Sequence, residues 1–247
     1  MAKRAASRST GTHDVKAVLA ELERLGSAQV RAEMGPCFGI VVDRAHGTTM
    51  AQLRELAKTI GRDQELSIAL WGTGVYDARM LACLIGEPAQ VSAAQMDAWC
   101  KDFDNWATCD TACFALFDRT PHAFAKVKQW AGHKPEFERR AAFALLASLA
   151  LHDKQSGDAP FLATLPLVRA AANDPRNFVK KGVSWALRGI GGRSVALREA
   201  AMELAEELAA SKDATERWVG KDVLRDIQRP LIARRAEQRD ATRTKRK

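Results

Sequence analysis

Residues 139–147 read Arg-Arg-Ala-Ala-Phe-Ala-Leu-Leu-Ala. Alanine and leucine have high intrinsic helix propensity, and the apolar positions of this run recur at spacings of three and four residues. The run therefore predicts an α-helix.

The same kind of apolar segment recurs along the chain. Five aromatic residues each begin such a segment, at intervals of 30, 31, 41 and 40 residues: Tyr76, Trp106, Phe137, Phe178 and Trp218. Turn signals such as Gly86-Glu87-Pro88 and Asp174-Pro175 lie between the segments and leave room for a second helix. A period near 40 residues with two helices per unit predicts an all-α fold, a HEAT-like or armadillo-type superhelical solenoid.

Charge divides the chain into three parts. Residues 1–12 and 231–247 carry net charges of +3 and +5, whereas residues 13–230 hold 28 basic and 28 acidic side chains. The sequence thus predicts a solenoid domain over residues 13–230 between two flexible basic tails. The tails would either attract a polyanion without specificity or serve only solubility.

A second periodic feature is a basic residue three positions after the repeated aromatic residue. It is present in four of the five repeats, as Arg79, Arg140, Lys181 and Lys221. Equivalent positions of a solenoid form a stripe along one surface. We therefore expect these four side chains to form a track for a phosphate backbone or for carboxylates.

Trp106 and Asp110 place an indole and a carboxylate one helical turn apart, on one face. A carboxylate beside an electron-rich ring suits a cation or a reaction that develops positive charge. Trp185 lies two turns after Phe178 on the corresponding face of the fourth repeat. We expect Trp106, Asp110, Arg140 and Trp185 to converge in one cleft, with the arginine at its rim.

From about residue 50 to residue 230 the sequence resembles the HEAT-like DNA alkylation repair proteins of the AlkD type. The resemblance is carried by residues 70–74 with Ala78-Arg79, by residues 106–110, by residues 137–140 and by residues 178–188. It implies a DNA glycosylase that excises cationic N-alkylated purines, such as 7-alkylguanine and 3-alkyladenine, from duplex DNA without a deep base-flipping pocket.

The resemblance also implies roles for single residues. Asp110 would be the catalytic carboxylate, Trp106 and Trp185 aromatic walls against the deoxyribose, and Arg140 a phosphate contact. A cationic base already leaves readily, so one carboxylate near the anomeric carbon suffices, and neither metal nor organic cofactor is implied.

The N-terminal part departs from the family pattern. Residues 13–50 contain Phe38 but neither Tyr nor Trp, so no N-terminal aromatic contact can be matched. Residues 32–40, Ala-Glu-Met-Gly-Pro-Cys-Phe-Gly-Ile, favour an interrupted helix before the first clear repeat.

An alternative of a different class stays open, namely a catalytically silent solenoid that binds DNA or protein. It would need the basic track but not Asp110. The sequence has no apolar run of about 20 residues, no secretory signal, and five cysteines without knuckle spacing, which together favour a soluble protein in the cytoplasm. We also expect the protein to be a monomer.

Overall fold

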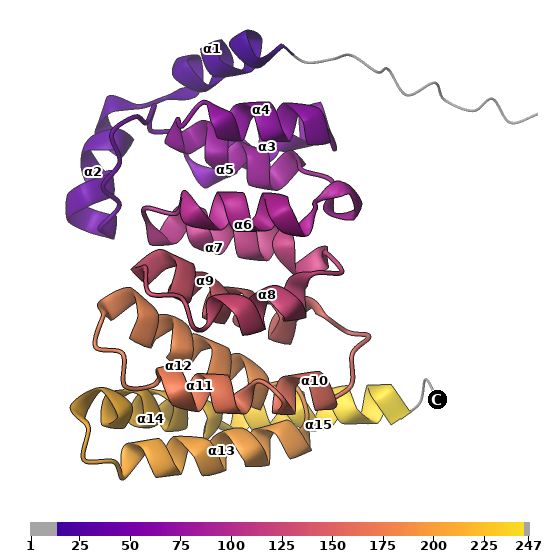
Figure 1. Cartoon of the computed structure of the whole chain (residues 1–247). Coiled ribbons are helices and arrows are strands. Elements are labelled where there is room, and N and C mark those ends of the chain that lie inside the picture. Colours follow the sequence, from indigo (N-terminus) through magenta and orange to yellow (C-terminus); the bar gives the residue numbers. More distant parts are fainter. Residues whose placement is uncertain (1–13, 245–247) are drawn as a thin grey trace, which may run out of the picture. The chain divides into compact units, whose positions relative to one another are not determined.

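The computed structural model describes residues 14–244, and this part of the chain is helical and contains no strand (Figure 1). The all-α fold predicted from the sequence is therefore confirmed. The chain divides into two compact units, with the boundary between Glu87 and Pro88. The single domain expected over residues 13–230 thus has an internal division at one of the predicted turns, Gly86-Glu87-Pro88.

The first unit holds five helices. They are α1 (Val15–Leu25), α2 (Ala28–Phe38), α3 (Met50–Ile60), α4 (Gln64–Gly72) and α5 (Tyr76–Ile85). Helix α3 begins at a capping box, in which the Thr49 hydroxyl accepts from the backbone N–H of Gln52 and the Gln52 side chain accepts from that of Thr49. The buried carboxylate of Asp77 holds the preceding segment, because it accepts hydrogen bonds from the backbone N–H groups of His46 and Thr48.

The expected interruption at residues 32–40 is later than the sequence suggested. Helix α2 runs through Pro36 to Phe38 and ends at Gly39, which has a φ of 63°. Pro36 lies in the last turn of the helix, and Gly39 adopts the left-handed conformation that commonly ends helices.

The second unit holds the remaining elements. They are η1 (Pro88–Gln90), α6 (Ala93–Lys101), α7 (Trp106–Ala115), η2 (Phe117–Arg119), α8 (Ala123–Trp130), α9 (Glu136–His152), α10 (Ala159–Leu162), α11 (Leu165–Ala171), α12 (Asn177–Gly191), α13 (Val195–Ala209), α14 (Ala214–Ile227) and α15 (Pro230–Thr244).

Helix α9 forms the centre of the second unit. It packs against α7, α8 and α12. Every residue from Arg140 to Ala150 is buried, so the helix is covered around its circumference rather than along one stripe. The run at residues 139–147, which predicted a helix, thus becomes the core of this unit and fixes the positions of α7 and α12 on either side.

Helices α13 and α14 approach each other closely at Gly220. A Cβ atom built there would lie 2.3 Å from the backbone nitrogen of Ala209 and 2.5 Å from the backbone oxygen of Ala205. Only glycine fits this contact, because the neighbouring atoms belong to the backbone of α13 and cannot rotate away.

The helix starts agree with four of the five repeated aromatic residues. Tyr76 and Trp106 are the first residues of α5 and α7, and Phe137 and Phe178 are the second residues of α9 and α12. The expectation for Trp218 was wrong. Helix α14 begins at Ala214, because the side chain of Asp213 accepts from the backbone N–H groups of Thr215 and Glu216.

The expected flexible C-terminal tail is also corrected, since α15 occupies most of residues 231–247. Ala236 is fully buried, Arg239 donates to the carbonyl oxygen of Gly192 at 2.8 Å, and Asp240 accepts from the N–H of Val195 at 2.9 Å. These contacts dock α15 on the C-terminal end of α12 and the N-terminal end of α13. The expected tail over residues 1–12 and the last residues, 245–247, lie outside the described part.

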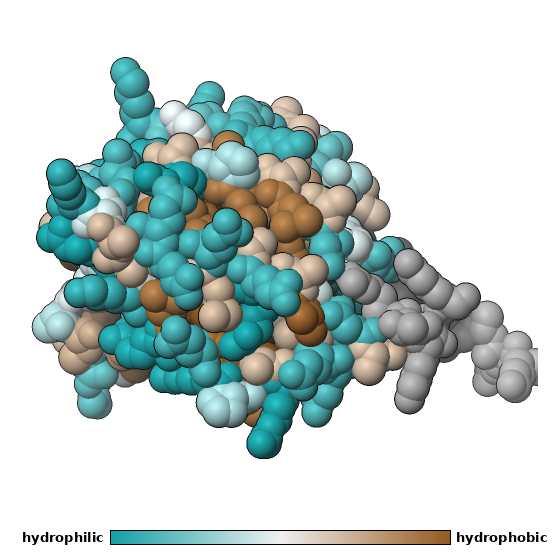
Figure 2. Space-filling model, turned by 90° about the horizontal axis from the view of Figure 1, so that it is seen from below, coloured by the Kyte–Doolittle hydropathy of each residue, from teal (hydrophilic) through white to brown (hydrophobic). Residues whose placement is uncertain are grey.

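Polar side chains predominate on the face of the molecule shown in Figure 2, with smaller hydrophobic patches between them. This is the distribution expected of amphipathic helices that turn their apolar sides inward. Among the described residues, no helix is long and apolar enough to cross a membrane.

Candidate functional site

Helix α7 positions the carboxylate of Asp110. The buried side chain of Asn105 accepts from the backbone N–H of Thr108 at 2.9 Å and thereby starts the helix at Trp106. Trp106 is half-buried, and Asp110 follows one turn later. The sequence reasoning did not single out Asn105, although an asparagine immediately before the first residue of a helix is a recognisable cap signal.

The guanidinium of Arg140 binds Asp110 through two parallel hydrogen bonds. Nε of Arg140 donates to Oδ1 at 2.9 Å, and Nη2 donates to Oδ2 at 2.7 Å. Nη1 donates to the carbonyl oxygen of Phe178 at 2.8 Å. The carboxylate is the more open partner, since 16% of the Asp110 side chain is exposed but only 7% of that of Arg140.

This pair determines the electrostatics of the site. Burial raises the pKa of the Asp110 carboxyl, and the charge and hydrogen bonds of Arg140 oppose the rise. Desolvation disfavours the charge of Arg140, but the Asp110 carboxylate raises the pKa of Arg140 above its ordinary value. Arg140 is therefore the group that favours the ionised form of Asp110, against the effect of burial.

The position of Arg140 differs from the expectation that it lies at the rim as a phosphate contact. The residue is buried, and α9 brings it against α7 and α12. Three of its donors are bound to Asp110 and Phe178. A helix position alone does not distinguish a cation that faces solvent from one that binds a carboxylate 30 residues earlier.

Trp185 is held by a chain of aromatic and polar contacts. Its indole stacks on the ring of Phe114, with the centroids 4.8 Å apart and the planes 9° from parallel. The edge contact of Phe114 with His152 has a centroid distance of 5.5 Å. Nδ1 of His152 lies 2.5 Å from the carboxylate of buried Asp118, which also accepts from the hydroxyl of Ser148 at 2.5 Å.

Sequence reasoning missed this support of Trp185. Phe114 lies four residues after Asp110 on α7, so helical spacing already puts the two on one face. That signal was available. The contacts of Asp118 and His152 join residues 34 positions apart and depend on the packing of η2 against α9.

A groove of about 380 Å³ adjoins the ion pair. It is lined by Arg140, Lys181, Trp185, Arg188, Trp218 and Asp222, which come from α9, α12 and α14. Arg140 thus connects Asp110 to a cavity with two indoles and two further cations. Asp110 itself does not line this groove and is joined to it through Arg140. The basic side chains of the groove can hold an anion.

The remaining residues expected at the site lie elsewhere. Trp106 precedes Asp110 by one turn but does not line this groove, and neither does Lys221, which is exposed on α14. Arg79 belongs to the first unit, where its guanidinium carbon lies 5.1 Å from the centroid of the Trp71 ring. Of the expected basic track, Lys181 is the member that lines the groove with an exposed side chain.

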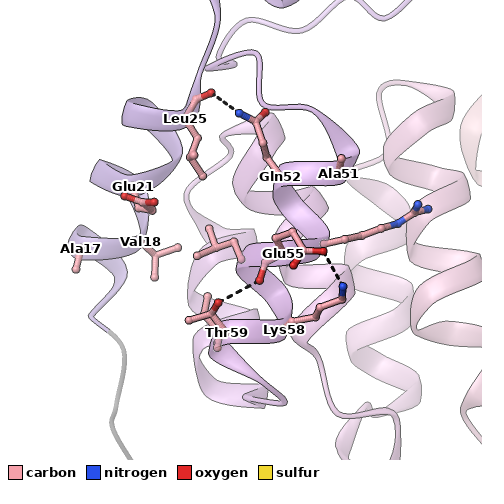
Figure 3. A pocket seen from close by; sticks show the side chains of 12 residues that line it. Ala17, Val18, Glu21, Leu25, Ala51, Gln52, Glu55, Lys58 and Thr59 are labelled. Carbon is pink, nitrogen blue, oxygen red and sulfur yellow. Dashed lines mark hydrogen bonds and ion pairs between the residues drawn. The ribbon is translucent and has the colours of Figure 1, made fainter.

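A larger groove, of about 880 Å³, lies in the first unit between α1 and α3 (Figure 3). Its two carboxylates pair with cations of their own helices, Glu21 with Arg24 and Glu55 with Lys58, each at 2.6 Å. The amide of Gln52 donates to the carbonyl oxygen of Leu25 across the groove at 3.2 Å. Its charges are thus paired locally, and it is not lined by an aromatic side chain.

Within residues 14–244, no three His, Cys, Asp or Glu side chains come together as a metal site would require.

Comparisons with known proteins bear on the family and the fold of the chain. The sequence family described as DNA alkylation repair enzyme matches residues 18–227. One similar solved structure is described as "a new family of proteins related to the HEAT-like repeat DNA glycosylases with affinity for branched DNA structures". It has a TM-score of 0.71 and 21% sequence identity, and the match covers 86% of this chain and 95% of that chain. That likeness confirms the HEAT-like fold. No curated protein matches the chain.

Proposed function

This chain belongs to the DNA alkylation repair enzyme family, and from that premise we propose that it is a DNA glycosylase. It would release cationic N-alkylated purines, such as 7-alkylguanine and 3-alkyladenine, from duplex DNA. The observation that supports this most is the carboxylate of Asp110, which is partly exposed, lies one turn after Trp106 and is oriented by Arg140 beside an indole-lined groove.

The chemistry needs one carboxylate. Alkylation at a ring nitrogen makes the base cationic, so the base leaves as a neutral purine with the electron pair of the C1′–N bond. Positive charge then develops on the sugar, and the Asp110 carboxylate stabilises it. Water adds to C1′ and gives up a proton to the carboxylate, which leaves an abasic site.

Arg140 is compatible with this role for Asp110. An ionised carboxylate has about four lone-pair sites, of which the two hydrogen bonds from Arg140 occupy two. The others remain for the attacking water or the sugar. Arg140 therefore acts as a positioning residue that holds the carboxylate in one orientation and favours its ionised form.

Exposed lysines supply the contacts to the DNA backbone. Lys181 lines the groove, and Lys221 is exposed on the neighbouring helix α14. The basic track envisaged from the sequence thus relies in this unit on Lys181 and Lys221 rather than on Arg140. Contacts to phosphate fix the register of the protein on DNA without reading its sequence.

The test is incubation of the purified protein with duplex DNA that carries 7-methylguanine or 3-methyladenine. We expect released base and abasic sites to accumulate in equal amounts. DNA binding without release of either base would contradict the proposal.

That contradicting result would favour a second candidate, a catalytically silent DNA-binding solenoid. Two observations support it. Both oxygens of Asp110 already accept hydrogen bonds from Arg140. The similar solved structure, in addition, is described as belonging to a family with affinity for branched DNA.

A further inference from the structure

The groove beside the ion pair continues past Trp185 to Trp218 on α14. Trp218 is 38% exposed. A single exposed tryptophan is ordinary on a protein surface. This one, however, lines the same cavity as Trp185 and lies under the ammonium group of Lys180, whose Nζ is 5.1 Å from the ring centroid. The groove is therefore lined by two indole side chains, those of Trp185 and Trp218.

Cations accompany these indoles. Lys181 is exposed, and within the described residues it makes no ion pair. Nε of Arg188 has no hydrogen-bond acceptor and lies 3.9 Å from Oδ2 of Asp222. Asp222 is already engaged, because it accepts from the hydroxyl of Ser184 at 2.6 Å and pairs with Arg225. Lys181 thus keeps its donors for an anion from outside. The buried Nε of Arg188 is not available to such an anion, but 33% of the Arg188 side chain is exposed.

We propose that the Trp218 end of this groove binds one unpaired nucleobase of the DNA, which stacks on the indole of Trp218 while Lys181 and Arg188 hold its phosphate. Base–aromatic stacking beside a cationic groove is a common way in which proteins bind the unpaired bases of single-stranded DNA or RNA. The inference rests on the proposed binding of DNA, but it does not depend on base release.

The occupant is an unpaired base for two reasons. A paired base has both faces covered by its neighbours in the duplex, so it offers no face to an indole. The volume of about 380 Å³ lies near the lower end of the range for small-molecule sites and suits one nucleotide rather than a duplex.

The experiment compares two undamaged duplexes of the same sequence, one fully paired and one with a single bulged adenosine. Binding of each to the full chain is measured by fluorescence anisotropy. We expect the wild type to bind the bulged duplex more tightly. Trp218→Ala should reduce affinity for the bulged duplex by about 5-fold to 150-fold and leave affinity for the paired duplex unchanged.

Three further variants test the interpretation. Trp218→Phe keeps an aromatic face and should retain most of the preference for the bulge. Leu231→Ala, which truncates another exposed apolar side chain of the second unit, should leave both affinities unchanged. Lys181→Ala should weaken binding of both duplexes, because a phosphate contact is common to them.

The inference is overturned if the wild type shows no preference for the bulged duplex. It is also overturned if Trp218→Ala retains that preference, or if Trp218→Ala weakens binding of both duplexes equally. If the protein releases base but shows no preference for the bulged duplex, this inference is contradicted and the proposed function is not. Failure to bind either duplex would contradict the proposed function as well.

Discussion

Arg140 donates to both carboxylate oxygens of Asp110, at 2.9 and 2.7 Å, across the contact between α9 and α7. The two residues are 30 positions apart, which is one repeat of the solenoid. The charge at the proposed catalytic position is thus set by a neighbouring repeat rather than by the helix that carries it.

Replacement of Arg140 by alanine should lower the free energy of unfolding and leave the binding of DNA phosphates unchanged. Removal of one partner from a buried ion pair costs about 3–5 kcal/mol, because the other charge stays buried and unpaired. The free energy of unfolding, measured in urea, should fall by this order. The salt dependence of DNA binding by the folded protein should be unchanged, whereas Lys181→Ala should lower its slope by about one phosphate contact. A lower slope in the folded Arg140→Gln protein, which lacks the charge but keeps a polar side chain, would return Arg140 to the phosphate track.

The rate of base release should depend on pH through the ionisation of the Asp110 carboxyl. The ionised carboxylate is the active form, and burial raises its pKa. Activity should therefore fall as the pH drops through this raised pKa. The fall should occur at a higher pH than it would with an ordinary aspartate, whose pKa is about 3.9. Arg140→Gln removes the charge that opposes the rise and should move the fall to still higher pH. The measurement is single-turnover release between pH 4 and 8, corrected for spontaneous loss of the base. An identical profile in Arg140→Gln and wild type would contradict the assignment.

Phe114 should affect catalysis through Trp185. The stack between the two rings is worth about 0.5–1.5 kcal/mol beyond its buried area, which corresponds to about 2-fold to 12-fold in rate if it orients the indole against the sugar. Phe114→Leu should slow single-turnover release by this factor. Phe124→Leu is the matched control, since Phe124 is also half-buried and contacts another aromatic ring, that of Phe161 at 5.3 Å. Equal rates for the two variants would remove Trp185 from the reaction.

Gly220→Ala should destabilise the second unit by forcing α13 and α14 apart. The added Cβ would lie 2.3 Å from a backbone atom of α13, and overpacking of this kind costs about 1–3 kcal/mol. Gly132→Ala serves as the control, because nothing lies within 4 Å of a Cβ at that position. Urea unfolding of the two variants gives the comparison, and a Gly220→Ala protein as stable as the control would show that the helices can separate without cost.

The fold could be predicted from the sequence because helix periodicity and repeat spacing are local signals that the packing preserves. Residues 139–147 predicted a helix, and that helix is the core of the second unit. The start of α14 was misplaced because the aromatic repeat was given more weight than the cap at Asp213. Helix α15 was missed because its basic composition resembles that of a tail, while its docking depends on single contacts such as that of Arg239 with Gly192.

The candidate site could be predicted only in part. Helical spacing alone put Trp106 and Asp110 on one face of a helix. Spacing could not show that Arg140 points at Asp110, because a basic residue on a helix looks the same in sequence whether it meets solvent or a carboxylate. The support of Trp185 by Phe114 and His152, and the continuation of the groove to Trp218, likewise arise from contacts between repeats.

The most direct test of the account is the rate of base release by Asp110→Asn. Asparagine keeps the size of the side chain but removes the charge that would stabilise the sugar cation. Single-turnover release of 7-methylguanine from duplex DNA should be abolished, with DNA affinity within a few-fold of wild type. Asp226→Asn, which changes a half-buried carboxylate paired with Arg229, should release base at the wild-type rate. Undiminished release by Asp110→Asn would contradict the assignment of Asp110 as the catalytic carboxylate.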